Sequence, residues 1–290
     1  MREFDANDYL SKKVDAINKF FKDNELDSVV LGVSGGIDSA VVLMLFSVAS
    51  VLDGSPIKNI RAVTMPIVGN GTSTQSEATK KANALYNLNL PNTSWRRCDL
   101  TDSYDAMVAQ AYPDSPNAWA NGQMASVIRT PMLYYQAAIL QQDGFRSVVS
   151  GTTNRDEGSY IGFFGKASDG MVDVQPIGDI HKSEVYRLAE ALGVPDVIVS
   201  DDPRGDVWDG KTDEEMIGAP YWFLQEYLEN LGDPDWLSQG HESLKIDRST
   251  FDLYVDNIES LHRKNKHKYQ VGSPAHFIDV MERCVPGGWN

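Results

Sequence analysis

The chain has 290 residues, 42% of them hydrophobic, which suits one large α/β domain with a buried core. Its 26 basic and 41 acidic residues give a net charge of −15, which argues against a nucleic-acid partner. The N-terminus lacks the apolar core of a signal peptide, and no apolar run approaches the ~18 residues of a membrane span. Cys98 and Cys284 fit neither a metal-binding spacing nor a disulfide framework. We therefore expect a cytoplasmic protein that binds neither membranes nor nucleic acids.

The apolar pattern predicts helices and strands in alternation. A helix is expected at 9–21 and a first strand at 29–33, followed by a helix that runs through 40–46. Further strands are predicted at 60–65, 94–100 and 146–151, and further helices at 76–88, 101–111 and 123–142. Residues 112–121 are expected to form a loop, and Pro131 should lie in a bend or near an end of the long helix. This alternation favours a doubly wound parallel sheet with helices on both faces and a ligand site beyond the carboxyl ends of its strands.

The segment SVVLGVSGGIDSA at 28–40 carries the strongest functional signal. A buried strand ends there in Ser34-Gly35-Gly36, and a helix starts directly afterwards. The glycines allow the backbone to approach a ligand closely, and amides at a helix N-terminus bind anions. Asp38 places a carboxylate where a phosphate-bound Mg²⁺ would sit. The segment therefore predicts a loop that holds Mg²⁺ and a polyphosphate.

Other glycine-rich motifs compete for these residues. A Walker A loop requires a lysine after the glycines, and the dinucleotide fingerprint requires a spacing that Gly32, Gly35 and Gly36 do not have. Gly32 to Gly36 does match G-x-S-x-G, the nucleophile elbow of α/β-hydrolases. That elbow normally follows several strands, whereas only one helical stretch precedes it here. A glycine turn without a ligand, with Asp38 as a plain helix cap, is the simplest alternative.

The hexapeptide SGGIDS resembles the PP-loop of the ATP pyrophosphatase superfamily, whose members split ATP between its α and β phosphates and transfer AMP. A second block, GTTNRDEGSYIGFFGKASDGMVD, occupies 151–173 and is followed by VQPI and HKSEV. Further matches in the same order are Met65-Pro66, the run 212–221 and His267-Lys268. Together these segments resemble the ammonia-dependent NAD⁺ synthetases over about residues 28–270.

This resemblance implies an adenine nucleotide alpha hydrolase-like fold in a single domain over 1–290, with an N-terminal helix at about 1–27 and a closing segment at about 255–290. The implied reaction is ATP-dependent amidation of deamido-NAD⁺ by ammonia through an acyl-adenylate, with release of AMP and pyrophosphate. Relatives are homodimers, so a dimer is expected. Only 33 residues precede Ser34, which leaves no room for a glutaminase domain, so free ammonia or a separate subunit should supply the nitrogen.

Residue roles follow from the resemblance position by position. Asp38 and Glu157 should hold Mg²⁺, and Lys182 should neutralise the β and γ phosphates; these three are the implied catalytic residues. The implied ATP-binding residues are Gly32, Val33, Ser34, Gly35, Gly36, Ile37, Asp38, Ser39, Met65, Thr152, Lys182 and Arg204. The implied substrate-binding residues are Arg129, Lys166, Asp173, His267 and Lys268.

The chain departs from the family pattern at three places. The long helix carries GQMASVIRTPM at 122–132, where only Arg129 of the usual arginines is kept. One extra residue separates Glu157 from Gly162, and Arg204 replaces a phosphate-binding threonine. These departures leave open two other functions, a PP-loop enzyme that amidates or thiolates a different substrate and a nucleotide-binding module without catalysis.

Overall fold

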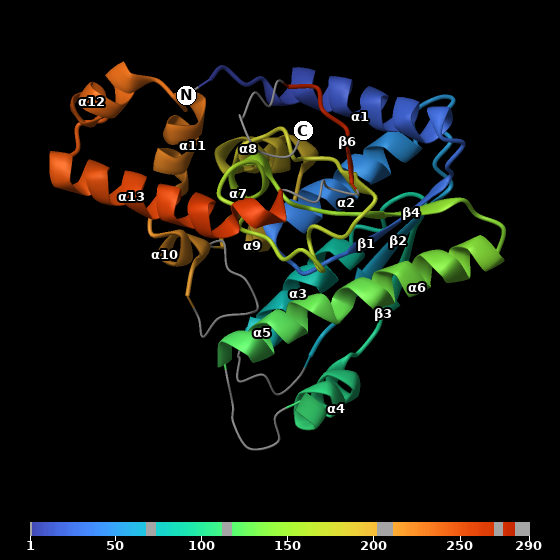
Figure 1. Cartoon of the computed structure of the whole chain (residues 1–290). Coiled ribbons are helices and arrows are strands. Elements are labelled where there is room, and N and C mark those ends of the chain that lie inside the picture. Colours follow the sequence, from blue (N-terminus) through green and yellow to red (C-terminus); the bar gives the residue numbers. More distant parts are fainter. Residues whose placement is uncertain (1, 68–73, 112–117, 202–210, 270–274, 282–290) are drawn as a thin grey trace.

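The computed structural model describes residues 2–67, 74–111, 118–201, 211–269 and 275–281. At its centre lies a six-stranded sheet in the order β3-β2-β1-β4-β5-β6, in which all neighbouring strands run parallel (Figure 1). The strands are β1 (Ser28–Gly32), β2 (Asn59–Thr64), β3 (Thr93–Arg97), β4 (Ser147–Ser150), β5 (Val174–Gln175) and β6 (His276–Phe277).

Helices connect the strands and cover both faces of the sheet. They are α1 (Ala6–Asp23), α2 (Ile37–Ser50), α3 (Thr74–Tyr86), α4 (Thr101–Ala111), α5 (Ala118–Val127), α6 (Arg129–Gln142), α7 (Arg155–Gly158), α8 (Lys182–Leu192), α9 (Asp196–Val199), α10 (Asp213–Ile217), α11 (Tyr221–Glu229), α12 (Pro234–Ser243), α13 (Arg248–Asn265) and the 3-10 helix η1 (Lys266–Lys268). Helices α1, α2 and α8 pack together on one face, and α6 packs on β1 and β4 from the other. The doubly wound parallel α/β sheet predicted from the sequence is therefore confirmed.

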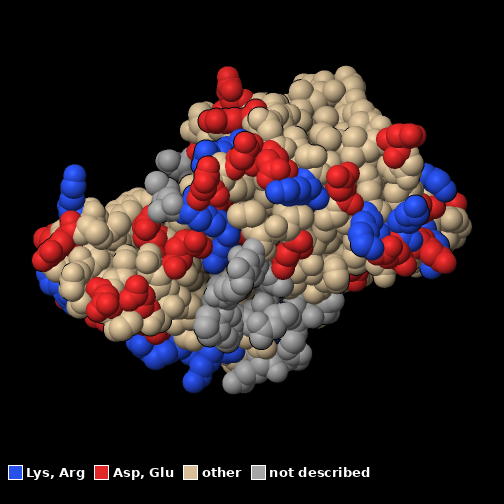
Figure 2. All heavy atoms as spheres, turned by 90° about the horizontal axis from the view of Figure 1, so that it is seen from above, with Lys and Arg blue, Asp and Glu red and all other residues tan. Residues whose placement is uncertain are grey.

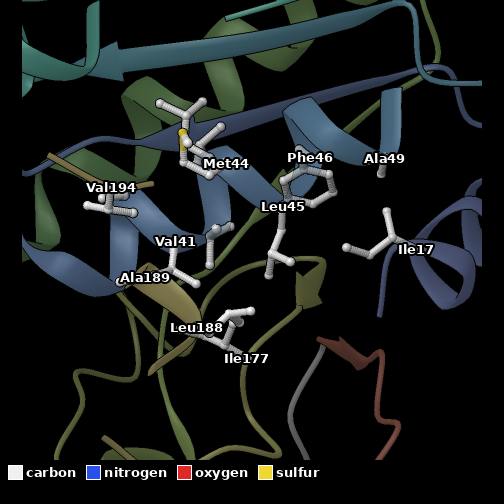
Figure 3. Packing of buried hydrophobic residues seen from close by; sticks show 14 of the residues in the cluster. Ile17, Val41, Met44, Leu45, Phe46, Ala49, Ile177, Leu188, Ala189 and Val194 are labelled. Atoms are coloured by element: carbon white, nitrogen blue, oxygen red, sulfur yellow. The ribbon is translucent and has the colours of Figure 1, made fainter. Parts of the chain in front are cut away.

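Strand β1 feeds a hydrophobic core on each face of the sheet. Val29 and Leu31 join the core beneath α1, α2 and α8, whereas Val30 joins the core under α5 and α6. Figure 3 shows part of the first core, where Ile17 of α1 and Leu188 of α8 lie close to the apolar side chains of α2. Burial on both faces explains why this strand reads as a continuous apolar run and not as an alternating one.

The strand order reverses beside β1. Val30 of β1 pairs with Arg61 of β2 on one side and with Val149 of β4 on the other. In parallel sheets of this kind, ligands bind beyond the carboxyl ends of the strands at such a reversal. The loops 33–36 and 151–154, which follow β1 and β4, lie at this point.

Helices α10 to α13 form a separate group with a core of its own, drawn mostly in orange at one side of the sheet in Figure 1. Phe223, Phe251 and Ile258 lie at its centre, and Tyr160 and Ile161 pack into it. Because Tyr160 and Ile161 closely follow α7, this helical group anchors the chain segment that leaves that helix.

The structure corrects two of the predicted elements. Residues 118–121, expected in a loop, already belong to α5. The helix predicted over 123–142 is two helices that meet at Ile128, and Pro131 lies in the first turn of α6, where a missing amide costs little. Strands β5 and β6 were not predicted, because each has two residues and depends on distant partners, as when Val174 pairs with Ser150 and His276.

The surface carries charges of both signs. On the face seen in Figure 2, the basic and acidic side chains are interspersed over the surface. None of the described helices combines the length and the apolar character that crossing a membrane requires.

Candidate functional site

The loop between β1 and α2 is built tightly around two glycines. Gly35 has φ +91°, and a Cβ there would lie 2.7 Å from the carbonyl oxygen of Ala78 in α3. Gly36 is the N-cap of α2, and its amide donates to Ser34 Oγ at 3.1 Å. Ser39 Oγ donates back to the Gly36 carbonyl at 2.9 Å. The loop is thus held by its own side chains at the start of a long helix, where the first amides can bind an anion.

Asp38 reaches from α2 to residues that come much later in the chain. Its Oδ2 accepts from Lys182 Nζ at 2.6 Å, and its Oδ1 accepts from Asn154 Nδ2 at 2.9 Å. Glu157 Oε1 joins this group by accepting from Asn154 Nδ2 at 2.7 Å, from the Tyr221 hydroxyl at 2.9 Å and from Lys182 Nζ at 3.3 Å. Asp38 is the second residue of α2, whose N-cap is Gly36, so the alternative that Asp38 caps a helix is wrong.

The electrostatics of this cluster are set by burial and by mutual attraction. Burial lowers the pKa of Lys182, but Asp38 and Glu157 more than offset this, so its pKa lies above the ordinary value and the ammonium stays charged. Burial raises the pKa of Glu157 to about 8, with a further contribution from Asp38 and an opposing one from Lys182. Because the pKa of Glu157 is raised, a further positive charge beside it would favour its carboxylate form.

Asp38 and Glu157 fit Mg²⁺ by their donor chemistry. Both carboxylates converge on the Lys182 ammonium, and Mg²⁺ prefers one or two carboxylates together with phosphate and water oxygens. Within the described ranges no group of three or more His, Cys, Asp or Glu side chains could hold a metal ion by itself. Phosphate and water oxygens would fill the remaining positions around a Mg²⁺ bound by Asp38 and Glu157.

Two adjoining cavities open beside the cluster. The small cavity, about 230 Å³, is lined by Gly32, Val33, Met65 and Thr152 together with other residues. The large cavity, about 630 Å³, is lined by the loop 34–39, Thr152, Glu157 and Lys182, among others. The two share lining residues and form one cleft. Of the predicted ATP-binding residues, all that the structure describes line this cleft; Arg204 lies outside the described residues.

Two of the predicted substrate-binding residues also lie in the cleft. Arg129 lines both cavities, and its Nε donates to the Met65 carbonyl at 3.3 Å. Lys268 lines the large cavity, where its Nζ donates to the carbonyls of Gly162 at 2.7 Å and Phe164 at 2.5 Å. Burial lowers the pKa of Lys268.

The other three predicted substrate-binding residues do not line either cavity. Lys166 and His267 are exposed. Asp173 has a structural role, because its Oδ2 accepts from the Val149 amide at 2.7 Å and its Oδ1 accepts from the Tyr134 hydroxyl at 3.2 Å. Their role in binding the substrate stays a prediction.

Sequence reasoning assigned no role to Asn154 and Tyr221, which complete the cluster. Asn154 donates to both Asp38 and Glu157, and its Oδ1 also accepts from the Glu157 amide at 3.1 Å as the N-cap of α7. An asparagine three residues before an acidic residue is a capping pattern, so Asn154 could have been found. Tyr221 is the first residue of α11 and ends the run 212–221, which belongs to the family resemblance but was given no role there.

A buried pair behind the cluster joins α7 to α8. Asp156 Oδ2 accepts from the Lys182 amide at 2.7 Å, and its Oδ1 lies 2.5 Å from His181 Nδ1. His181 Nε2 lies 3.0 Å from Glu229 Oε1. Burial lowers the pKa of His181, but the two carboxylates outweigh it, and the pKa is raised. Asp156 and His181 are the sequence neighbours of Glu157 and Lys182, so this pair fixes the positions of both.

The site geometry does not favour the hydrolase alternative. The Ser34 hydroxyl accepts from the Gly36 amide and lies 3.3 Å from Ser39 Oγ. Among the described residues, no histidine forms a hydrogen bond with Ser34 that would activate it as a nucleophile.

The chain is similar to known proteins over most of its length. The family model for NAD synthase matches residues 9–272. An NH(3)-dependent NAD(+) synthetase from Methanococcoides burtonii is 30% identical over 268 residues, which are 92% of this chain and 94% of that protein. The protein of the same name from Archaeoglobus fulgidus is 35% identical over 253 residues, 87% of this chain and 90% of the relative.

Solved structures share the fold. The NMN synthetase from Francisella tularensis has a TM-score of 0.72 and 25% identity, and the match covers 92% of this chain and 97% of that one. The NH3-dependent NAD synthetase from Campylobacter jejuni has a TM-score of 0.65 at 24% identity, with 92% and 96% covered. The family match includes both halves of the cleft, from the loop 34–39 to Lys268. This chain therefore belongs to the NAD synthase family.

Proposed function

We propose that the chain is an ammonia-dependent NAD⁺ synthetase, which uses ATP to convert the nicotinate carboxylate of deamido-NAD⁺ into the carboxamide of NAD⁺. The observation that carries this proposal is the meeting of the loop 34–39 with Glu157 and Lys182 in one cleft. An enzyme that cleaves ATP needs both a phosphate-binding loop and neutralisation of the charge that develops. The relatives named NH(3)-dependent NAD(+) synthetase support the choice of substrate.

In the first step the nicotinate carboxylate attacks the α-phosphorus of ATP, pyrophosphate leaves, and an acyl-adenylate forms. The amides in the first turn of α2 and the hydroxyls of Ser34 and Ser39 would bind the leaving pyrophosphate. Lys182 would neutralise its charge as the bond breaks. Mg²⁺, when bound by Asp38, Glu157 and phosphate oxygens, would supply further charge neutralisation.

In the second step ammonia attacks the acyl carbon, AMP leaves, and the nitrogen loses a proton to give the amide. This step requires that water be kept from a hydrolysable intermediate. Thr152 and Met65, which line the small cavity, would lie against the ATP nucleoside, and Arg129, which lines both cavities, would bind the dinucleotide substrate.

The assay mixes the chain with ATP, Mg²⁺, ammonium and deamido-NAD⁺ and measures NAD⁺ and AMP. We expect both products in equal amounts. Formation of neither would refute the proposed function, and so would AMP without NAD⁺, which would show that ATP or the acyl-adenylate is hydrolysed and not amidated. As a control, the Asp38→Ala variant should keep the fold by circular dichroism and lose turnover that depends on Mg²⁺.

A second candidate substrate is the mononucleotide, nicotinic acid mononucleotide. The observation that favours it is the likeness to a structure described as an NMN synthetase, with a TM-score of 0.72. The two substrates are distinguished by kcat/KM for each under identical conditions. A higher value for the mononucleotide would favour this second candidate.

We also propose that the enzyme is a cytoplasmic homodimer. The family resemblance supports the dimer, and Tyr135 of α6, which is 60% exposed, offers apolar surface for a partner. Sedimentation equilibrium should give twice the mass of one chain at micromolar concentration, and a monomer mass would contradict the proposal.

A further inference from the structure

Lys81 of α3 lies against the loop that is expected to bind phosphate. A Cβ built on Gly35 would be 3.1 Å from the Cβ of Lys81 and 2.7 Å from the carbonyl oxygen of Ala78, so one turn of α3 packs directly on this glycine. Lys81 also lines the large cavity. Its ammonium forms an ion pair with Asp201, which follows α9 and lines the same cavity.

The partners of Lys81 differ from those of the other lysines in the large cavity. Lys182 is held by two carboxylates, Asp38 and Glu157, that are only 18% and 15% exposed. Lys268 is held by two backbone carbonyls. Lys81, whose side chain is 12% exposed, has one carboxylate partner in the described part of the chain, Asp201, which is 36% exposed. Because Asp201 is the more exposed partner, its carboxylate can be hydrated again when a stronger anion takes its place beside Lys81.

The charges around the large cavity favour such an exchange. Its acidic lining residues are Asp38, Glu77, Glu157, Asp169, Asp201 and Asp213, and its basic ones are Arg129, Lys81, Lys182 and Lys268. Among the described lining residues, acidic side chains therefore outnumber basic ones in the region that a polyphosphate enters. If the Asp201 carboxylate moves into water, the Lys81 ammonium can attract the polyphosphate and offset part of its repulsion by the acidic side chains.

We propose that Lys81 is an additional polyphosphate-binding residue and that Asp201 holds its ammonium in place until phosphate oxygens displace the carboxylate. The proposal rests on the proposed function for the assignment of the polyphosphate as ATP. Phosphate bound at the first amides of α2 would lie beside Gly35, where a Cβ would be 3.1 Å from the Cβ of Lys81. The Tyr186 hydroxyl donates to the backbone carbonyl of Asp201 at 3.4 Å and so holds the backbone of Asp201 beside the cavity.

The test measures the binding of inorganic pyrophosphate, in the presence of Mg²⁺, by calorimetry. The single variants are Lys81→Met, Lys81→Arg and Asp201→Asn. A double variant combines Lys81→Met with Asp201→Asn. Lys80→Met is the matched control, because Lys80 is the neighbour on the same helix, is 73% exposed and does not line the cavity. Thermal unfolding of each variant shows whether the fold is kept.

We expect Lys81→Met to weaken pyrophosphate binding by about tenfold or more, the worth of one charge-assisted hydrogen bond. Lys81→Arg should restore most of the affinity, and Lys80→Met should bind as the unchanged protein does. Asp201→Asn should tighten binding when Lys81 is present and have no effect in the Lys81→Met background. A merely general effect of removing a negative charge would appear in both backgrounds.

Equal binding by Lys81→Met and Lys80→Met would overturn the proposal, as would absence of pyrophosphate binding by the unchanged protein. If Lys81→Met unfolds at a lower temperature, the proposal is tested with the folded Lys81→Arg and Asp201→Asn variants. Asp201→Asn must then tighten pyrophosphate binding, and Lys81→Arg must keep most of the affinity. The titration contains pyrophosphate and Mg²⁺ but no nicotinate substrate. The role of Lys81 and the proposed function can therefore be refuted independently of each other. If the protein makes NAD⁺ but binds pyrophosphate equally well without the Lys81 ammonium, only the role of Lys81 is refuted. If pyrophosphate binding depends on Lys81 but no NAD⁺ is made, only the proposed function is refuted.

Discussion

The ammonium group of Lys182 lies 2.6 Å from Oδ2 of Asp38, although 144 positions separate the two residues in the chain. Each belongs to the first turn of a helix, Asp38 in α2 and Lys182 in α8. These helices pack together in the core drawn in Figure 3, where Val41 and Leu45 face Leu188. The hydrophobic core therefore sets the distance between two polar groups of the cleft.

Replacing Lys182 by methionine should lower kcat strongly. The variant removes the ammonium that both carboxylates contact and that would neutralise the departing pyrophosphate, a change that typically costs about 10²–10³ in rate. Single-turnover release of pyrophosphate measures the effect on the step in which the acyl-adenylate forms. The exposed Lys80→Met variant serves as the control, and a Lys182→Met enzyme within tenfold of the unchanged protein would contradict the assigned role.

A second prediction concerns stability and the buried Lys13. Its Nζ contacts both carboxylate oxygens of Asp179 at 2.9 and 3.0 Å, and both side chains are fully buried. Lys13→Met leaves Asp179 without its ammonium partner and should lower the free energy of unfolding by about 3–5 kcal/mol. Lys12→Met removes an exposed ion pair with Asp8 and should change it by less than about 0.5 kcal/mol. Urea unfolding of both variants tests this, and similar losses would contradict it.

The sequence was sufficient for the parts of the site that depend on local pattern. The loop 34–39 follows a buried strand and starts a helix, so its position could be predicted from apolar residues and glycines alone. The resemblance to a family added Glu157 and Lys182, and the structure brings both to Asp38. The doubly wound sheet followed from the alternation of strands and helices.

What the sequence could not predict are pairings between distant side chains. Tyr221 reaches Glu157 across 64 positions, and Lys81 reaches Asp201 across 120. Neither contact has a local signature, because each depends on how whole helices dock. Strand β6 is a similar case, since two residues at 276–277 gain their strand conformation only by pairing with β5.

A third prediction separates two costs at Gly35. Alanine there must adopt φ +91° and would also place a Cβ 2.7 Å from a backbone oxygen of α3. Gly54 has φ +75° with no atom within 4 Å of its Cβ position, so Gly54→Ala carries the backbone cost alone. We expect Gly54→Ala to destabilise by about 1 kcal/mol and Gly35→Ala by clearly more, with weaker pyrophosphate binding only in the latter. If both variants lose the same free energy of unfolding in urea, α3 must move away from the new Cβ of residue 35 without a measurable cost.

The last prediction is a pH dependence of stability that comes from His181 and Glu229. The raised pKa of His181 means that its stabilisation is fully present below its ordinary pKa of 6.5 and is lost as the pH rises through the raised value. The hydrogen bond from His181, with the charge of Arg155, lowers the pKa of Glu229 to about 2, so its stabilisation is present above 4.5 and lost as the pH falls.

The His181→Gln variant isolates this contribution. The pKa of Glu157 is raised from 4.5 to about 8, so this residue also makes the protein less stable as the pH rises through that range. The test therefore uses the difference in free energy of unfolding between the unchanged protein and His181→Gln at each pH. The free energy of unfolding in urea, measured from pH 5 to 9, should favour the unchanged protein most below pH ~6.5, and the advantage should shrink above it. A difference that stays constant over this range would show that His181 acts only through packing and a neutral hydrogen bond. A shrinking difference requires that the ring be charged between Asp156 and Glu229, so that the link between α7 and α8 weakens in alkali.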